Sequence, residues 1–233
     1  MKLYISDLHF GHRNVIMFDH RPFKDREEMD NTLIHLWNGR VQNNDDVYVL
    51  GDFCYRSDKT ADWYLRQLKG RKHLVIGNHD GDMLNNPKAM SYFETVDKMQ
   101  QVTDGDKQIC LCHFPIAEWD GMRKGYWHIH GHIHVRHDDT YEFMKTREHA
   151  LNAGCMINNY TPASFNELVR NNRYFREKGD THTLDGDDIM SNLLEICSRF
   201  ERKNGRLLTE EEAVQLTGQI RKEIHARKDD DQT

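Results

Sequence analysis

The sequence predicts an α/β fold, in which short buried strands alternate with amphipathic helices. Apolar runs rich in β-branched and aromatic residues have the length of strands at 2–6, 46–50 and 73–76. Between them, apolar residues recur every three or four positions, as in a helix with one buried face. Each run ends directly in polar residues that can bind a metal ion. That layout is expected where neighbouring strands of an α/β sheet end at a common edge.

The composition indicates one sizeable domain with a small appendage, because the chain has 233 residues. With 32 basic and 38 acidic residues, its formal net charge of −6 gives no overall nucleic-acid-binding character, although a local cationic site is compatible with it. The five cysteines form no paired framework, which favours reduced thiols. No stretch approaches the ~20 apolar residues of a membrane span. We therefore expect a cytoplasmic protein without a membrane segment.

The first half of the chain alternates strand and helix. The segment 25–40 begins with acidic residues, which suit a helix N-terminus, and then places Met29, Leu33 and Trp37 four residues apart. A second amphipathic helix is predicted over 60–68. Polar motif residues follow the strands before and after it.

The second half contains a stretch, 126–134, with histidine at every second position. In an extended strand, alternate side chains share a face, so these imidazoles are expected on one face and the isoleucines on the other. Gly131 indicates a place where another group approaches the backbone closely. A solvated polar face explains the stretch equally well. The four histidines are His128, His130, His132 and His134.

The other elements of this half follow from short apolar runs and helical spacing. Strands are predicted at 108–112, 140–144 and 149–153, and a helix at 164–174. We place the end of the main domain at residue 176. The remaining 177–233 are turn-rich and then show two stretches of helical spacing, which predict a helical C-terminal extension. It would serve as a lid, a dimerisation element or a docking site.

Five polar clusters follow one another in a fixed order along the chain. They are Asp7-x-His9, Gly51-Asp52, Gly77-Asn78-His79-Asp80, His113 and Gly131-His132-x-His134. This ordered set resembles the signature of the calcineurin-like metallophosphoesterase superfamily and spans about residues 2–158. The phrase at 6–15 is similar to that of a small bacterial and phage branch of phosphoesterases. The resemblance implies a four-layer sandwich of two mixed β-sheets flanked by helices, formed by residues 1–176.

The resemblance also implies two divalent metal ions, bridged by Asp52. It assigns Asp7, His9 and His134 to one ion, and Asn78, His113 and His132 to the other. Such a mixed nitrogen and oxygen set suits Mn²⁺, our first expectation, and also Fe, Ni, Co or Zn. Two carboxylates, two divalent ions and a hydroxide leave roughly +1 in the pocket, which attracts phosphate.

Further roles concern the substrate. The resemblance assigns His79 to the substrate, where it would protonate the leaving oxygen or hydrogen-bond the transition state, with Asp80 orienting that histidine. The phosphoprotein phosphatases of the superfamily carry Asp-Arg where this chain has Tyr55-Arg56, which argues against that branch. Candidate phosphate contacts are His12, Arg13 and Arg56.

The sequence thus predicts a metal-dependent phosphoric ester hydrolase, a phosphodiesterase or phosphatase. Its expected substrate is a nucleotide or a nucleic-acid end, attacked by a metal-bridging hydroxide. A second copy of the chain, held through the C-terminal helices, is a further candidate partner. One alternative is a structure-specific nuclease, with a basic track built from 21–26 or 66–72. The other is a non-catalytic scaffold of the same fold.

Overall fold

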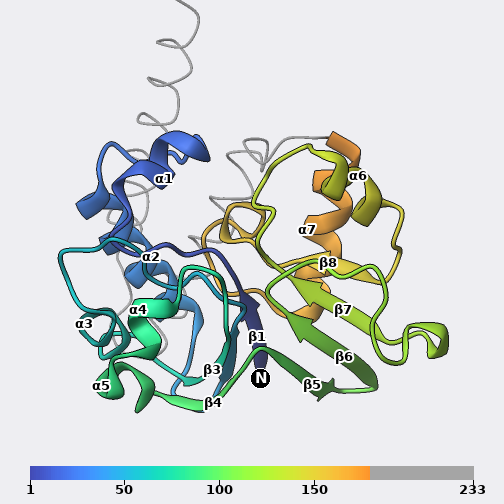
Figure 1. Cartoon of the computed structure of the whole chain (residues 1–233), viewed down its shortest axis with the longest axis horizontal. Helices are drawn as coiled ribbons and strands as arrows, with labels where there is room; N and C mark the ends of the chain where they lie inside the picture. The colour runs from blue at the N-terminus through green and yellow to red at the C-terminus, as the bar shows by residue number, and fades with distance from the viewer. Residues whose placement is uncertain (179–233) are drawn as a thin grey trace, which may run out of the picture. The chain divides into compact units, whose positions relative to one another are not determined.

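The computed structural model describes residues 1–178, which form two four-stranded β-sheets flanked by helices (Figure 1). The predicted α/β class and the sandwich of two sheets are confirmed. Helix α7 (Phe165–Lys178) continues past residue 176, and the expected boundary there stays a prediction. The predicted helices of the C-terminal extension lie outside the described residues. Within 1–178, no helix combines the length and the apolar character needed to cross a membrane.

The first sheet is parallel throughout, in the order β1-β2-β3-β4. Because its strands run in the same direction, their C-terminal ends meet at one edge, where the first three polar motifs follow. The strands are β1 (Lys2–Ile5), β2 (Asp46–Val49), β3 (Arg71–Val75) and β4 (Phe93–Asp97). The helices between them are α1 (Arg13–Phe18), α2 (Arg26–Arg40), α3 (Ala61–Leu65), α4 (Gly81–Leu84) and α5 (Pro87–Met90).

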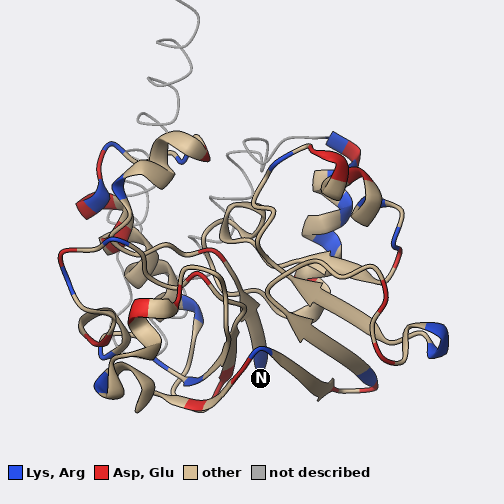
Figure 2. Cartoon of the chain, viewed as in Figure 1, with Lys and Arg blue, Asp and Glu red and all other residues tan. Residues whose placement is uncertain are grey.

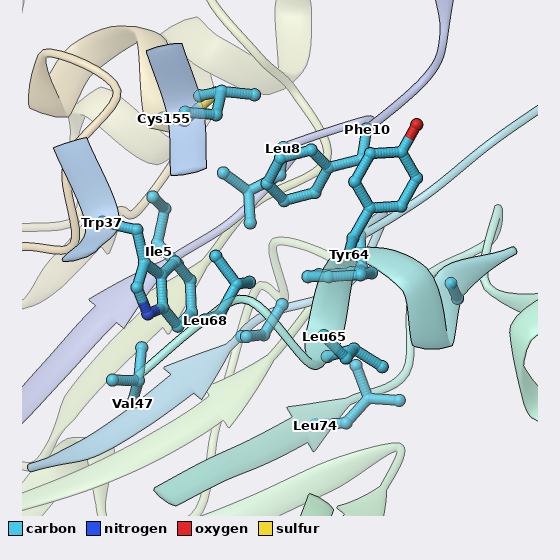
Figure 3. Close-up of a cluster of buried hydrophobic side chains, with 14 of the residues drawn as sticks. Ile5, Leu8, Phe10, Trp37, Val47, Tyr64, Leu65, Leu68, Leu74 and Cys155 are labelled. Atoms are coloured by element: carbon cyan, nitrogen blue, oxygen red, sulfur yellow. The ribbon is translucent and has the colours of Figure 1, made fainter. Parts of the chain in front are cut away.

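Helix α2 forms as the sequence predicts. The Asp25 side chain caps it by accepting a hydrogen bond from the backbone N–H of Glu28 at 2.9 Å. Met29, Leu33 and Trp37 form its buried face. Figure 3 shows Trp37 among the buried apolar side chains that helices and strands contribute to this core. Helix α3 is shorter than predicted, but Leu68, beyond its end, still joins this core.

The second sheet has the order β5-β6-β7-β8, with only the β5–β6 pair antiparallel. A shared core joins the two sheets, since Tyr4, Leu50 and Val75 pack in one cluster with Ile109 and Ile129. The strands are β5 (Met99–Asp104), β6 (Lys107–Cys112), β7 (Trp127–His130) and β8 (Ala150–Asn152). Helix α6 (Asp139–Lys145), helix α7 and two short 3-10 helices, Met122–Lys124 and Cys155–Asn158, complete this half.

The strand predicted at 140–144 is wrong, because this segment forms helix α6. Asp138 caps the helix by accepting from the backbone N–H of Tyr141 at 3.1 Å. Tyr141 and Met144, three residues apart, are its buried side chains, so the apolar spacing is helical. Strands β4 and β5 were not predicted, because exposed and half-buried side chains make up both of them and leave no apolar run.

The histidine strand is shorter than predicted and ends at His130. His132 and His134 have left-handed backbone conformations, with φ of 70° and 51°, so the alternation of faces stops before them. The expectation that four imidazoles share one face is therefore wrong. The close approach expected at Gly131 is confirmed, because a Cβ there would overlap the Ser6 side chain.

His128 is a buried structural residue that we expect to make the protein acid-sensitive. Its Nδ1 lies 3.1 Å from the Cys110 carbonyl oxygen and its Nε2 accepts from the Ile116 N–H at 3.3 Å, so the neutral ring satisfies both partners. Burial lowers the pKa of His128 to about 4. The unfolded chain therefore binds the proton more readily. The contribution of the neutral His128 ring to the free energy of unfolding is fully present above pH 6.5, and it is lost as the pH falls towards 4.

The loss attributable to His128 should amount to roughly 2 to 3 kcal/mol of unfolding free energy between pH 7 and pH 4.5. Urea denaturation of metal-free protein at both pH values measures it. His128→Gln should lose less stability than the wild type over this interval. The exposed His35→Gln should behave like the wild type. An unchanged pH dependence in His128→Gln would contradict the assignment.

Candidate metal centre

The seven predicted ligands come together at the strand ends of both sheets. Asp7 and His9 follow β1, and Asp52 follows β2. The others follow β3, β6 and β7. The backbone N–H of His132 donates to the Asp7 carboxylate at 3.2 Å, which ties a loop of the second sheet to a loop of the first. Residues far apart in the sequence thus form one polar centre between the sheets. The ligands after β3, β6 and β7 are Asn78, His113, His132 and His134.

The first cluster consists of Asp7, His9, Asp52 and His134, whose candidate ligand atoms all lie within 4.8 Å of one another. The two Nε2 atoms of His9 and His134 are 3.3 Å apart. Asp7, His9 and Asp52 are at most 2 % exposed. Water therefore does little to screen these groups from one another.

The first cluster favours a positive charge at its centre. His134 Nδ1 lies 2.8 and 2.9 Å from the two carboxylate oxygens of Asp19, so Nδ1 carries a proton and Nε2 faces the cluster. That Nε2 is 3.6 Å from Asp7 Oδ1. Burial lowers the pKa of His134, but the Asp7 and Asp19 carboxylates outweigh burial and raise it overall. Either a proton or a metal ion between these atoms would offset the negative charge of the two carboxylates.

The second cluster consists of Asn78, His113 and His132. His113 Nδ1 lies 2.7 Å from the Leu50 carbonyl oxygen and must donate to it, so Nε2 of the neutral ring carries a lone pair. This Nε2 faces Asn78 Oδ1 at 3.0 Å. The same amide oxygen lies 2.9 Å from His132 Nδ1. His113 Nε2 and Asn78 Oδ1 are therefore two acceptor atoms in close approach, as in a site built for a cation.

Asp52 lies between the two clusters. Its Oδ2 is 3.6 Å from His9 Nε2 and 3.5 Å from His113 Nε2. Burial, reinforced by the Asp7 carboxylate, raises the pKa of Asp52 to about 6 although His113 lowers it. One buried oxygen that faces both clusters has the position of a ligand shared by two ions.

Two of the imidazoles, those of His9 and His132, are held in the neutral form that metal binding requires. Burial lowers the pKa of His9 well below its usual value, and the nearby Arg21, His134 and other cationic groups add to this. Burial and His113 lower the pKa of His132 to about 4. Metal ions therefore meet no competing proton at these two rings near neutral pH.

Strained backbone aims most of the ligands. Asp7, His9 and Asp52 have φ of 57°, 53° and 54°, in the left-handed region that His132 and His134 also occupy. Such conformations cost about 1–3 kcal/mol each and persist only where surrounding contacts hold them. Strand periodicity does not predict where these side chains point.

Asp80 supplies one of those contacts, and its position differs from the expected one. Its fully buried carboxylate accepts from the backbone N–H groups of Asp52, Phe53 and Gly77 at 3.1, 2.9 and 2.7 Å. It was expected to orient the His79 ring; the structure instead uses it to fix the loops after β2 and β3. Asp80 thus acts on the centre through the backbone of Asp52.

His79 lies beside the first cluster. Its backbone N–H donates to Asp52 Oδ1 at 2.8 Å, and its ring centroid is 5.5 Å from that of His9 and 4.1 Å from that of Tyr55. The ring is half-buried, so a substrate can reach it. In the phosphoprotein phosphatases an aspartate occupies the sequence position of Tyr55. Here the Tyr55 ring packs against the His79 ring, and no carboxylate comes from that position.

The three candidate phosphate contacts differ in their positions. The His12 ring is 5.5 Å from His9, and its Nδ1 is buried without a hydrogen-bond partner in the described structure. Arg56 is exposed and its guanidinium carbon lies 5.1 Å from the Tyr55 ring centroid. Arg13 is exposed at the first residue of α1. Only His12 is in contact with the rings of the first cluster.

The sequence interpretation missed Asp19 and Arg21. Both are buried, and Arg21 donates to Asp19 Oδ2 through Nε at 3.1 Å and Nη2 at 3.0 Å. Neither belongs to a polar motif or follows a strand. The contact between Asp19 and His134 joins segments 115 residues apart, so no local pattern signals it.

No family model matches the chain. It is similar to "Uncharacterized protein MJ1445" of Methanocaldococcus jannaschii, with 34% identity over 172 residues that cover 72% of this chain and 90% of that protein. The Gene 66 protein of Mycobacterium phage L5 is 30% identical over 158 residues, covering 56% of this chain and 76% of that protein. The Gene 66 protein of Mycobacterium phage D29 is 29% identical over 162 residues, which cover 57% of this chain and 78% of that protein. The chain belongs to the family of the MJ1445 protein.

Solved structures are similar as well. The protein of unknown function AQ665 from Aquifex aeolicus has a TM-score of 0.59 and 27% identity, covering 73% of this chain and 98% of that one. Vps29 of Entamoeba histolytica, complexed with Zn²⁺, has a TM-score of only 0.29 with 19% identity, covering 57% and 64%. A likeness at that score carries no weight here. The AQ665 protein shares the fold over nearly its whole length.

Proposed function

We propose that this protein is a dinuclear metal-dependent phosphoesterase of the calcineurin-like metallophosphoesterase superfamily. The observation that carries the proposal is the set of acceptor atoms around Asp52. His113 Nε2 lies 3.0 Å from Asn78 Oδ1 and 3.5 Å from the buried Asp52 Oδ2, and with a neutral ring and an ionised carboxylate none of these three atoms has a proton to donate. Such atoms repel one another unless a cation lies among them. The first cluster, on the other side of Asp52, also favours a positive charge at its centre.

The ligand assignment follows from the two clusters. Asp7, His9 and His134 would bind one ion, and Asn78, His113 and His132 the other, with Asp52 shared. When bound, the two ions would lower the pKa of a shared water and neutralise phosphoryl oxygens during in-line displacement.

The choice of metal follows from the donor atoms. The Cys155 thiol lies beside the turn that carries Asp7, where it donates to the Asp7 backbone oxygen at 3.2 Å. Burial raises the pKa of Cys155 to about 12, so it stays protonated. With only nitrogen and oxygen donors, the site suits Mn²⁺ first, and Fe, Ni, Co or Zn as alternatives.

The remaining residues would act on the substrate. His79, held over the first cluster by its backbone bond to Asp52, is placed to protonate the leaving oxygen. His12 and Arg56 line the same side and would contact the phosphate. We propose a nucleotide or a nucleic-acid end as the substrate. Cytoplasmic location and self-association through the C-terminal helices stay predictions.

The nuclease alternative is less well supported, because several of the basic residues in its candidate tracks are engaged in contacts within the fold. Arg71, at the start of β3, makes two 2.8 Å bonds to Asp46 at the edge opposite the metal centre. Lys72 donates to the carbonyl oxygens of Leu68 and Gly70. In the view of Figure 2, lysines and arginines are scattered over outer loops and helix ends among acidic residues.

Metal-dependent turnover tests the proposal. Protein stripped with a chelator should be inactive and should hydrolyse bis-p-nitrophenyl phosphate, p-nitrophenyl phosphate or both when Mn²⁺ is restored. The ratio of the two rates distinguishes phosphodiesterase from phosphatase activity, and a panel of nucleotides and short oligonucleotides then narrows the substrate. Metal binding without turnover of any ester would favour the scaffold alternative. Absence of both would refute the proposal.

A further inference from the structure

We infer that Asp19 and Arg21 are positioning residues of the first cluster, and that the affinity of this cluster for a metal ion depends on them. The inference rests on the proposed cation site. Both residues lie in the segment between α1 and α2, outside the five polar motifs. Together they contact two of the four residues of the first cluster.

Asp19 fixes the orientation of His134. Both of its carboxylate oxygens lie within 2.9 Å of His134 Nδ1, so the ring can neither rotate nor exchange its two nitrogens without losing this bond. Nε2 is thereby directed at His9 and Asp7. A carboxylate behind a ligand histidine also makes the facing nitrogen a stronger donor to a metal.

Arg21 fixes the turn that carries Asp7. Its Nη2 donates to the Asp7 carbonyl oxygen at 2.8 Å and its Nη1 to that of Leu8 at 2.9 Å. These carbonyls belong to the turn in which Asp7 and His9 take the left-handed conformation. The Arg21 side chain is fully buried, so no water replaces these bonds. The guanidinium therefore holds a strained turn that aims two ligands.

The ion pair between Asp19 and Arg21 joins the two effects. The Asp19 carboxylate holds His134, a ligand that follows a strand of the second sheet. The Arg21 guanidinium holds the turn that carries Asp7, after a strand of the first sheet. The opposite charges of Asp19 and Arg21 neutralise each other in the interior. Other contacts hold the second cluster: the Leu50 carbonyl oxygen orients His113. Loss of the ion pair should therefore weaken the first cluster selectively.

Metal titration of the full-length protein tests this inference. Chelator-stripped protein is titrated with Mn²⁺ by calorimetry, and His134→Ala identifies the binding step that belongs to the first cluster. Asp19→Asn keeps the size of the side chain, but it removes the negative charge and replaces one of the two acceptor oxygens with an NH2 group, which repels the N–H of His134 or of Arg21. It should weaken that same step by about 10- to 100-fold and leave the other step unchanged. Asp62→Asn, at a buried aspartate paired with Lys88, is the matched control and should bind like the wild type.

A second measurement separates orientation from general stability. In Co²⁺-loaded protein, the exchangeable proton on His134 Nδ1 should give a shifted NMR signal that is absent from His134→Ala. In Asp19→Asn this signal should exchange faster with water. Arg21→Lys, which cannot supply the planar fork of donors, should weaken the same binding step and serves as the test if Asp19→Asn does not fold.

The outcomes separate the two proposals. Wild-type protein that binds Mn²⁺ while Asp19→Asn and Arg21→Lys bind it equally well would overturn the inference and leave the proposed function standing. Equal weakening of both binding steps would also overturn it. Wild-type protein that binds no divalent ion would refute the proposed function and this inference with it.

Discussion

Asp52→Asn should abolish metal-dependent ester hydrolysis, with a loss of roughly 10³-fold or more, because metal ions supply several kcal/mol of transition-state stabilisation. The Asp52 Oδ2 atom faces His9 and His113 at 3.6 and 3.5 Å, so one substitution removes a ligand from both clusters. An amide bears no charge to offset two cations. Calorimetric titration with Mn²⁺ should show that metal binding and activity are lost together.

The same substitution should not harm the metal-free protein. Because burial raises the pKa of Asp52 to about 6, the folded chain binds a proton more tightly than the unfolded chain does. The Asp52 carboxyl group therefore lowers the free energy of unfolding as the pH rises from 3.8, the pKa of the unfolded chain, towards 6, the pKa of the folded chain. This destabilisation persists at pH 7. Thermal unfolding in chelator should show Asp52→Asn at least as stable as the wild type. Added Mn²⁺ should stabilise the wild type alone.

Asp62→Asn again serves as the control and should keep both metal binding and activity. Two results would contradict the expectation for Asp52. Full activity in Asp52→Asn would show that the chemistry does not pass through this centre. A large loss of stability in chelator would show that Asp52 serves the fold rather than the ions.

The sequence specifies the positions of the ligands better than their directions. Asp7, Asp52 and Asn78 follow strands of a parallel sheet, and the geometry of such a sheet brings strand ends together whatever the loops do. His132 and His134 share the sequence parity of His128 and His130, but their left-handed backbone turns them into the metal centre. A periodicity of two has no meaning beyond the last residue of a strand.

Contacts between segments that are far apart in the sequence could not be predicted from local sequence patterns. The loop at 19–21 reads as a polar connection, yet its Asp19 lies against His134. Asp80 sits within a motif, and its position beside His79 suggested a role for that ring. The three backbone N–H groups that it accepts from become its partners only when the loops after β2 and β3 pack together. Motif membership indicated importance in this case, but not the contact.

Gly77→Ala should destroy the metal centre without removing a single ligand. A Cβ at Gly77 would overlap Asp52 Oδ1 and would lie 2.6 Å from the Asp52 backbone nitrogen and 3.0 Å from Gly51 Cα. Two of these three atoms are backbone, so the loops after β2 and β3 would have to separate. Displacing catalytic groups by about 1 Å costs on the order of 10²-fold in rate, and we expect at least that loss together with weakened Mn²⁺ binding.

Gly81→Ala is a close control for this prediction, four residues further along the chain. A Cβ at Gly81 meets no atom within 4 Å, and the residue begins helix α4, where alanine is favourable. Calorimetry and turnover should therefore find it equal to the wild type. If Gly77→Ala also retained metal binding, Asp52 would not need the close approach of the two loops. Because Asp80 bonds to Gly77 and to Asp52 at once, the structure predicts that the two loops cannot move apart without moving the shared ligand.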